Sequence, residues 1–462
     1  PLLERRPGAF VFSAGTAAGG LTLFTRDPKE TPMSVTTVPD REQANQLAVE
    51  RMTSADPVLV DIRPAIDVVP GMTTNTVLTS GAPMPWERYT GGQRNAVIGG
   101  ALFEGLASDP DDADAKLRDG RIKLGACHDY GCVGSLAGIY TASMPVFVVE
   151  NRDRGNVAFC NSFEGSSRKR LNYGVYDDEV RESLLFLQDV AAPIIGEALR
   201  GTKDGIALKP IIRRALNMGD ELHSRNAAAT LLFTRELLPH LLDVSARKPV
   251  QTREVVDFMV DNDYFFLRLS MAASKATADA ARDVEGSTIV TAMTFSCQEF
   301  AIRVSGLGDE WFTCGLPEID AKLFEGYTRD DIEVMGGESI INETVGLGGF
   351  AQAAAFPLQD YQGGSPQGMI ENTERMYEIT VAEHPTYRIP ALSFRGVPIG
   401  IDVDRVVSTG IGPVMDVGVA GRSGGQIGAG LMTGPLQCFE AAAAACGERS
   451  GTATTDGSTT GA

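Results

Sequence analysis

The feature that most constrains the fold is a change of pattern near the middle of the chain. Between residues 177 and 281, apolar residues recur at helical spacing in several successive runs, and strand signals nearly vanish. Runs typical of strands lie on both sides, for example at residues 57–62, 144–151, 287–294 and 299–304. The pattern therefore predicts a mixed α/β (α+β) multidomain protein in which a helical domain is inserted between two α/β parts.

The chain has 462 residues, which is enough for two to four domains of ordinary size. We predict an N-terminal extension at residues 1–38 and a first α/β domain at residues 39–176. The helical domain follows at residues 177–285, and a second, glycine-rich α/β domain at residues 286–446. The remaining residues 447–462 are of low complexity and predict a disordered tail.

Composition narrows the possible partners. The formal net charge of −19 argues against nucleic acid, whose phosphates an acidic surface repels. No apolar run approaches the ~20 residues that span a bilayer, so we expect no membrane association. The seven cysteines are an odd number without short paired spacing, which suggests neither a disulfide framework nor a zinc ribbon and favours the reducing cytoplasm. An anionic ligand of such a chain needs a local basic pocket.

Residues 219–230 combine acidic, imidazole, guanidinium, amide and hydroxyl groups directly ahead of an apolar helix expected at residues 227–242. A helix N-terminus carries free N–H groups and partial positive charge, which suits an anion. We predict catalytic roles for Asp220, Glu221 and His223, and anion binding by Arg225 and Asn226. The alternative is an elaborate helix cap, in which Ser224 or Asn226 accepts backbone hydrogen bonds and Asp220 holds Arg225.

A second dense cluster occupies residues 125–138, where Cys127, His128, Asp129 and Cys132 lie among four glycines. We predict that His128 transfers a proton in a pocket shaped by these glycines. A buried structural histidine is the alternative. A metal site is disfavoured, because the spacing lacks the two pairs of a structural zinc site.

Further anion-binding candidates lie elsewhere in the chain. Arg94 follows Gly91 and Gly92 at the start of a small-residue helix, and Arg303 and Ser305 lie near the end of a strand. Gly424 and Gly425 belong to a run of seven glycines at residues 418–434, where backbone N–H groups can surround a phosphate. No phosphate-binding lysine motif or dinucleotide fingerprint occurs, so we expect no nucleotide cofactor, and none of another kind.

Several runs taken together resemble one bacterial family, including SGAPMPWERYTGGQRNAVIGGALFEGLA, LNMGDELHSRNAAA and GESIINETVGLGGFA. The resemblance covers about residues 58–446, and it is to the YlbE-like (AllG-like) family. This family was long labelled a domain of unknown function and includes a component of oxamate carbamoyltransferase. The chain departs from the family pattern at Thr79, Asp129, Tyr130, Ser224 and residues 295–297, which bears on the substrate.

The resemblance implies a cytoplasmic, oligomeric, multi-subunit transferase of allantoin (purine) catabolism. Its reaction moves a carbamoyl group between oxalurate and phosphate, giving oxamate and carbamoyl phosphate, with FdrA-like and YlbF-like subunits as partners. All these substrates are small anions, so we expect His128, Arg94 and Arg225 to meet in one cleft. Two alternatives stay open: a non-catalytic assembly or ligand-binding subunit, and a metal-dependent hydrolase that uses Cys127, His128 and His223.

Overall fold

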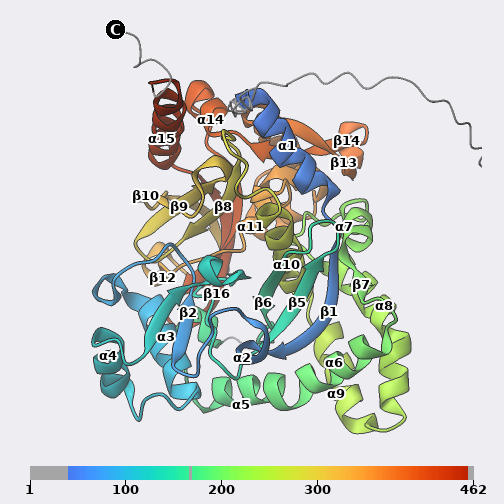
Figure 1. Ribbon diagram of the computed structural model, residues 1–462. Helices are drawn as coiled ribbons and strands as arrows, with labels where there is room; N and C mark the ends of the chain where they lie inside the picture. The colour runs from blue at the N-terminus through green and yellow to red at the C-terminus, as the bar shows by residue number, and fades with distance from the viewer. Residues whose placement is uncertain (1–39, 166–168, 456–462) are drawn as a thin grey trace, which may run out of the picture. The chain divides into compact units, whose positions relative to one another are not determined.

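The computed structural model describes residues 40–165 and 169–455 (Figure 1). By its contacts the chain divides into a short unit, Pro1–Thr37, and a large one, Val38–Ala462. The predicted extension at residues 1–38 lies outside the described residues. No helix among the residues that the structure describes is long and apolar enough to cross a membrane.

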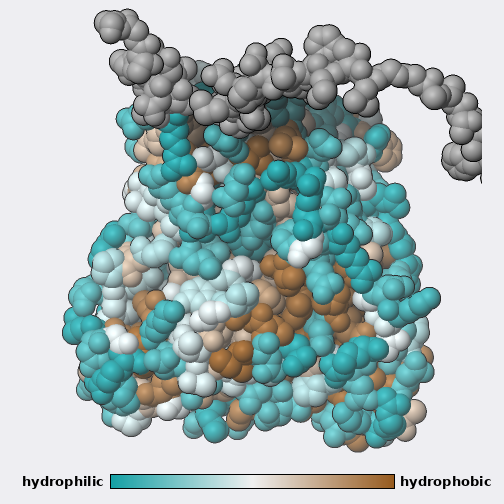
Figure 2. Space-filling view, in the orientation of Figure 1, coloured by the Kyte–Doolittle hydropathy of each residue, from teal (hydrophilic) through white to brown (hydrophobic). Residues whose placement is uncertain are grey.

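A five-stranded mixed sheet forms the first part of the large unit, in the order β4-β6-β5-β1-β7. Its strands are β1 (Pro57–Pro64), β4 (Cys132–Val133), β5 (Pro145–Asn151), β6 (Val157–Asn161) and β7 (Ile206–Ala207). Strands β1, β5 and β6 pair antiparallel, and β4 pairs parallel with β6. The β-branched runs predicted as strands at residues 57–62 and 144–151 are β1 and β5, two of the three inner strands of this sheet. Apolar residues come to the surface over this sheet in Figure 2.

Smaller elements complete the N-terminal part of the described chain. They are α1 (Arg41–Ser54), α2 (Ala65–Val68), α3 (Gly91–Phe103), α4 (Pro110–Arg118) and the parallel pair β2 (Thr76–Thr79) and β3 (Lys123–Ala126). A 3-10 turn, Cys127–Tyr130, follows β3 directly and carries His128.

The middle of the chain is helical as predicted, with α5 (Asp178–Phe186), α6 (Ala192–Gly201), α7 (Leu208–Leu216), α8 (Ala227–Ser245), α9 (Pro249–Val260) and α10 (Leu267–Asp279). Helix α10 packs on β5 and β6, and α6 packs on β1 (Figure 1). One apolar core contains residues of these strands, of α6 to α10 and of the C-terminal part, including Leu59, Phe233 and Val397. The predicted boundaries at residues 176/177 and 285/286 stay a prediction, and this core extends across both.

We expect Phe233→Ala to lower the free energy of unfolding by about 3–5 kcal/mol, because Phe233 is fully buried and packs on the rings of Phe265 and Phe266. Because the strands and the helices share this core, the variant should still unfold in a single transition. The urea midpoint of that transition should be lower than for the unaltered chain. Urea unfolding, monitored by circular dichroism and by tryptophan fluorescence, checks this. Two separated transitions would show instead that the helical segment unfolds as a domain of its own.

The C-terminal part contains three further sheets. The first has the order β10-β9-β8, from β8 (Val290–Phe295), β9 (Glu299–Val304) and β10 (Phe312–Gly315). The second has the order β11-β16-β15-β12, from β11 (Ile319–Leu323), β12 (Ile332–Glu333), β15 (Val414–Gly421) and β16 (Gly425–Thr433). The third is the hairpin of β13 (Thr380–Ile389) and β14 (Arg395–Ile401), on which α1 packs. The helices here are α11 (Ile341–Thr344), α12 (Leu358–Gln362), α13 (Pro366–Ile379), α14 (Val403–Thr409) and α15 (Leu436–Thr455).

Three sequence expectations change in this part of the chain. Helix α15 continues to Thr455, past the predicted start of the tail at residue 447, because the alanine run before that point has high helix propensity. The cysteine count suggested no disulfide, yet Cys314 and Cys438 form one across 124 residues, a separation that no local spacing reveals. The glycine run at residues 418–434, predicted as a loop, forms the β15–β16 hairpin, and anion binding by Gly424 and Gly425 stays a prediction.

Gly424 lies in the turn of that hairpin, and Gly425 is the first residue of β16. The φ of Gly424 is +84°, and a Cβ there would lie 2.0 Å from a methyl carbon of Val175. The glycine is therefore explained by turn geometry and close packing.

Candidate functional site

The turn before α8 is organised by two buried carboxylates. Glu221 accepts hydrogen bonds from the backbone N–H groups of His223 (3.0 Å), Ser224 and Arg225 (2.9 Å). Asp220 accepts one from the N–H of Ala229 in the first turn of α8 (2.8 Å). Acidic groups of the protein thus occupy the positive end of this helix, and they take the place that the helix-cap alternative gave to Ser224 or Asn226, whose side chains make no cap bond among the described residues.

His223 pairs with Glu343, a residue 120 positions away. The Nδ1 of His223 lies 2.8 and 3.0 Å from the two carboxylate oxygens of Glu343, and both side chains are buried. Burial alone opposes a charge on the imidazole, but the attraction and hydrogen bond of Glu343 outweigh it and raise the pKa of His223. Within the described part of the chain, Nε2 has no hydrogen-bond partner. The pair has the geometry of an oriented proton-transfer group.

Asp416 on β15 completes what we call the His223 cluster: Glu221, His223, Glu343 and Asp416. Its backbone N–H donates to Glu343 (2.9 Å), and its Oδ1 accepts from the side-chain amides of Gln352 (2.7 Å) and Gln362 (3.1 Å). Burial and the neighbouring charge of Glu343 raise the pKa of Asp416 to about 6. Burial and Asp416 also raise the pKa of Glu221 well above its usual range. The carboxyl groups of Asp416 and Glu221 therefore keep their protons to higher pH than ordinary carboxyl groups do.

Gly348 makes room for this arrangement. Its φ is +56°, and a Cβ there would lie 2.1 Å from a carboxylate oxygen of Glu343. The N–H of the next residue, Gly349, donates to the same oxygen (3.0 Å). The glycines of residues 346–349 thus let the backbone surround the Glu343 carboxylate.

A second group, the His128 cluster, consists of Cys127, His128, Lys275 and Glu338. His128 is fully buried, its Nε2 lies 3.9 Å from Oε1 of Glu338, and neither ring nitrogen has a hydrogen-bond partner among the described residues. Burial, followed by the charges of Lys275 and Arg303, lowers the pKa of His128 well below its usual value. This imidazole is neutral at pH 7 and can accept a proton only when its surroundings change.

The other members of the His128 cluster are also buried. Glu338 accepts a hydrogen bond from the N–H of Gly134 (2.7 Å), and burial raises its pKa to about 8. Lys275 is only 1% exposed and pairs with Asp279 (2.8 Å). Its burial follows from its position on α10, which is covered on nearly every side.

The segment of residues 338–343 connects the His128 cluster with the His223 cluster. Glu338 and Glu343 flank Asn342, whose side chain donates to the carbonyl of Leu222 (2.9 Å) and accepts from Ser274 on α10 (2.7 Å). Leu222 itself has a φ of +74°, a strained conformation for a buried leucine. The segment therefore ties α10 to the turn that carries His223.

Two of the predicted anion-binding residues lie close to these clusters. Arg225 donates to the carbonyl of Gly219 (3.0 Å), lies 3.4 Å from Asp220 and is one-third exposed. Arg303 is nearly buried, pairs with Asp129 (2.5 Å) and stacks on Trp311 (4.1 Å), whose ring packs edge-on against His128.

Asn226 and Ser305 have structural hydrogen bonds. Asn226 is buried and donates through its side-chain amide to the carbonyl of His223 (2.9 Å). Ser305 donates to the carbonyl of Ala281 (2.6 Å). These bonds fix the local backbone, and neither supports an anion-binding role.

Arg94 has a different environment. It forms an ion pair with Asp114 and stacks on Trp86 at 4.2 Å. The N-terminus of α3 is occupied by Glu333, which accepts a hydrogen bond from Gly92 (2.8 Å). The anion expected at this helix start is thus a carboxylate of the protein itself. These contacts do not support the expectation that Arg94 shares one cleft with His128 and Arg225.

We therefore expect Arg94→Ala to lower the free energy of unfolding by about 1–2 kcal/mol, since it removes a half-buried ion pair and a cation–π contact. Any ligand affinity of the folded chain should stay unchanged. Chemical unfolding and a binding titration at equal temperature test this. If Arg94→Ala loses ligand affinity but keeps the unfolding free energy of the unaltered chain, Arg94 belongs to the binding site.

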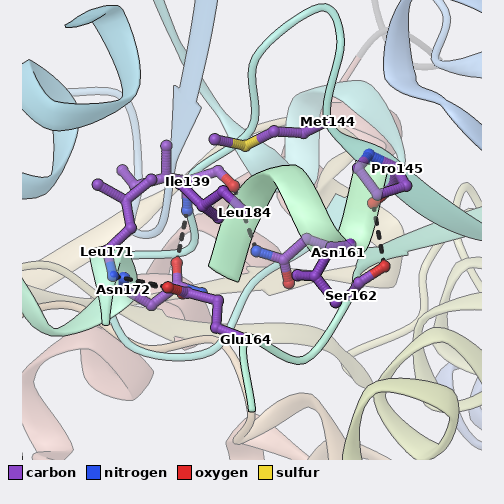
Figure 3. A pocket seen from close by; sticks show the side chains of 10 residues that line it. Ile139, Met144, Pro145, Asn161, Ser162, Glu164, Leu171, Asn172 and Leu184 are labelled. Atoms are coloured by element: carbon purple, nitrogen blue, oxygen red, sulfur yellow. Dashed lines mark hydrogen bonds between the residues drawn. The ribbon is translucent and has the colours of Figure 1, made fainter. Parts of the chain in front are cut away.

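A small cavity lies near the first sheet (Figure 3). It has a volume of 20 Å³ and is lined by Asn161, Ser162, Glu164 and Asn172 among others. Glu164 accepts hydrogen bonds from the N–H groups of Leu171 (2.6 Å) and Asn172 (3.0 Å). A cavity of this size holds about one water molecule, so it is no substrate site.

The sequence also left open a metal site formed by Cys127, His128 and His223. Across residues 40–165 and 169–455, no group of three or more His, Cys, Asp or Glu residues is arranged to hold a metal ion. Cys127, His128 and His223 thus form no ligand set, which leaves the metal-hydrolase alternative without support from geometry.

Known proteins resemble the chain over most of its length. The family model described as oxamate carbamoyltransferase subunit AllG matches residues 122–339. The oxamate carbamoyltransferase subunit AllG of Escherichia coli is 38% identical over 413 residues, which are 88% of this chain and 98% of that protein. The chain belongs to the AllG family. The resemblance stated from the sequence motifs is confirmed.

Two other relatives extend this comparison. The uncharacterized protein YahG of Escherichia coli is 41% identical over 410 residues, 88% of this chain and 86% of YahG. A crystal structure of a conserved protein of unknown function from Enterococcus faecalis superposes with a TM-score of 0.85 at 39% identity, covering 88% of this chain and 98% of that one. The AllG family fold thus matches a solved structure, and it is mixed α/β as predicted.

Sequence reasoning missed Glu343, Asp416 and Glu338. The run at residues 336–350 stood out for its two carboxylates among glycines, but nothing in it showed their partners. Asp416 interrupts an otherwise apolar strand, and a buried acid in such a strand is the signal that could have found it.

Proposed function

We propose that this AllG family member is a subunit of a carbamoyltransferase, and that its His223–Glu343 pair moves the proton during carbamoyl transfer between oxamate or oxalurate and phosphate. The observation that most supports this proposal is the pair itself. The imidazole of His223 is buried and oriented by the carboxylate of Glu343, which raises its pKa. Family membership supplies the reaction class, since the AllG relative is named as an oxamate carbamoyltransferase subunit.

The reaction needs a proton at one nitrogen. When phosphate oxygen attacks the carbamoyl carbon of oxalurate, the C–N bond to the oxamate nitrogen breaks, and that nitrogen must gain a proton. Because the pKa of His223 is raised, its imidazole keeps a proton to higher pH than an ordinary histidine does and can donate that proton as a general acid. In the opposite direction the neutral imidazole accepts the proton of the attacking oxamate nitrogen.

The acidic neighbours of His223 keep their protons to higher pH than ordinary carboxyl groups do. Burial is the chief cause that raises the pKa of Asp220 and of Asp416 to about 6 and that of Glu221 well above its usual value. A carboxyl group that carries its proton can donate a hydrogen bond to a substrate oxygen. Arg225, which is one-third exposed and lies 3.4 Å from Asp220, is a cation on the turn that carries His223.

The proposal includes partner proteins. FdrA-like and YlbF-like subunits would complete the oligomeric enzyme in the cytoplasm, in allantoin degradation. Purified chain, alone and with these subunits, is mixed with carbamoyl phosphate and oxamate, and phosphate release is followed. We expect turnover only in the mixture. Absence of turnover in every combination would contradict the transferase assignment.

A non-catalytic assembly or ligand-binding subunit is the second candidate. It is favoured by the burial of both clusters, whose hydrogen bonds are supplied largely by the protein itself. In that case the mixture would still release phosphate after His223→Asn. The same assay thus distinguishes the two functions.

A further inference from the structure

A cavity of 290 Å³ lies on one face of the sheet β11-β16-β15-β12. In the register of the two central strands, Val417 and Val419 of β15 lie opposite Gly430 and Gly428 of β16. Because glycine has no side chain, this face stays uncovered where the glycines lie, which leaves room beside the two valines. The volume is close to the lower end of small-molecule sites, which is about 300–1,000 Å³.

The cavity and the His223 cluster lie on opposite faces of this sheet. Asp416 of the cluster directly precedes Val417 on β15, and successive side chains of a strand point to opposite faces. Val417 lines the cavity, whereas Asp416 accepts its hydrogen bonds from Gln352 and Gln362. A ligand of the cavity therefore lies outside the proposed proton-transfer site.

Two residues of the apolar wall are held in place by the surrounding backbone. Phe295 and Leu136 line the cavity and are 8% and 9% exposed. The backbone of Phe295 exchanges two hydrogen bonds with Gly337 (3.1 and 2.8 Å), and a Cβ on Gly337 would lie 2.5 Å from the Phe295 ring. The carbonyl of Leu136 accepts a hydrogen bond from Ser80 (2.5 Å). The wall is thus formed before any ligand binds, which lowers the cost of binding.

Charged side chains of both signs also line the cavity. Arg329 and Glu318 are exposed, and within the described parts of the chain neither side chain has a hydrogen-bond or ion-pair partner. The second acid, Glu333, is already engaged, because it accepts a hydrogen bond from the N–H of Gly92 (2.8 Å). One cation and one anion therefore remain for a ligand that carries both charges.

We propose that this cavity binds an α-amino acid with an apolar side chain. The ligand carboxylate pairs with Arg329 and its ammonium group with Glu318, which fixes the orientation. The apolar side chain packs against Val417, Val419 and Phe295, and burial of its surface supplies the affinity. The inference goes beyond the proposed function and does not depend on it, because oxamate, oxalurate and carbamoyl phosphate have no apolar group to cover this wall.

Calorimetric titration of the full chain with L-phenylalanine tests this. Three comparison compounds each lack one of its groups: hydrocinnamate lacks the ammonium group, phenethylamine lacks the carboxylate, and glycine lacks the ring. We expect phenylalanine to bind about tenfold or more tightly than each of them, because each loses one charge contact or the burial of the ring.

Two variants at exposed positions should each remove one charge contact. Arg329→Met should weaken phenylalanine about tenfold and leave phenethylamine, which has no carboxylate, unchanged. Glu318→Gln should weaken phenylalanine by a similar factor and should not weaken hydrocinnamate, which has no ammonium group. These paired differences assign each charged end of the ligand to one side chain.

The apolar wall is tested at Val334, which lines the cavity and is 47% exposed, so a polar residue is tolerated there. Val334→Asn should weaken phenylalanine, hydrocinnamate and phenethylamine alike. The control Val407→Asn alters a valine of α14 that is 39% exposed and does not line the cavity, and it should bind as the unaltered chain does. No binding of phenylalanine, equal affinities for the three ring compounds, or unchanged binding by Arg329→Met and Glu318→Gln would each overturn the site.

Discussion

Replacing His223 by asparagine should lower the rate of carbamoyl transfer by the assembled enzyme about 10²–10⁴-fold, the usual contribution of a positioned general acid or base. Asparagine can still donate a hydrogen bond to Glu343, so the buried carboxylate keeps a partner. It cannot carry a proton to the leaving nitrogen. Phosphate release at saturating carbamoyl phosphate and oxamate measures the loss as kcat.

Glu343→Gln tests the same pair from the other side. The variant removes the negative charge that raises the pKa of His223, so the imidazole should lose its proton at a lower pH. The limb of the pH–rate profile that reports protonated His223 should therefore move to lower pH, an effect that a merely structural role of Glu343 does not produce.

The matched control is His240→Asn on α8, a half-buried histidine outside both clusters. It should leave kcat unchanged. Full turnover by His223→Asn, in a variant shown by circular dichroism to be folded, would exclude the pair from the chemistry and favour an assembly role.

The elements with strong local periodicity were predictable from the sequence. Helices at residues 177–281 and strands at 57–62 and 144–151 follow from spacing that each segment carries by itself. The way these segments pack is not local. Phe233 of α8 and Val397 of β14 belong to one core although 164 positions (397 − 233) separate them in the chain. For this reason the local spacing predicted a separate helical domain, although its helices share one core with the strands on either side of it in the chain.

The candidate site was predictable in part, for the same reason. Dense polar stretches pointed to His128 and His223, and both are buried beside carboxylates. The carboxylates Glu338 and Glu343 come from a segment more than 100 positions away, which spacing cannot reveal. Arg94 was predicted to bind an anion because it follows two glycines at a helix start, but in the folded chain its guanidinium pairs with Asp114 and stacks on Trp86.

Glu338 should make the stability of the protein fall as the pH rises. Burial raises its pKa from the ordinary 4.5 to about 8, so the folded chain retains a proton that the unfolded chain releases. Between these two values the folded state binds more protons, and stability therefore decreases with pH. The whole interval corresponds to a loss on the order of 4–5 kcal/mol.

Other groups titrate in the same range, so a difference between two variants isolates Glu338. Asp220 and Asp416, with pKa values of about 6, and His223 with its raised pKa act in the same direction. His128, whose pKa is lowered, acts oppositely as the pH falls below its usual value. Glu338→Gln keeps an acceptor for Gly134 and does not titrate, which leaves these other contributions in place.

We expect the unfolding free energy of Glu338→Gln to depend less on pH than that of the unaltered chain, and the difference between the two to change by several kcal/mol between pH 5 and pH 8. Urea unfolding at half-unit pH steps measures it. Glu325→Gln, at an exposed position, is the control and should follow the unaltered chain. Parallel curves for Glu338→Gln and the unaltered chain would mean that the Glu338 carboxyl group is ionised inside the fold, with Lys275 compensating its charge.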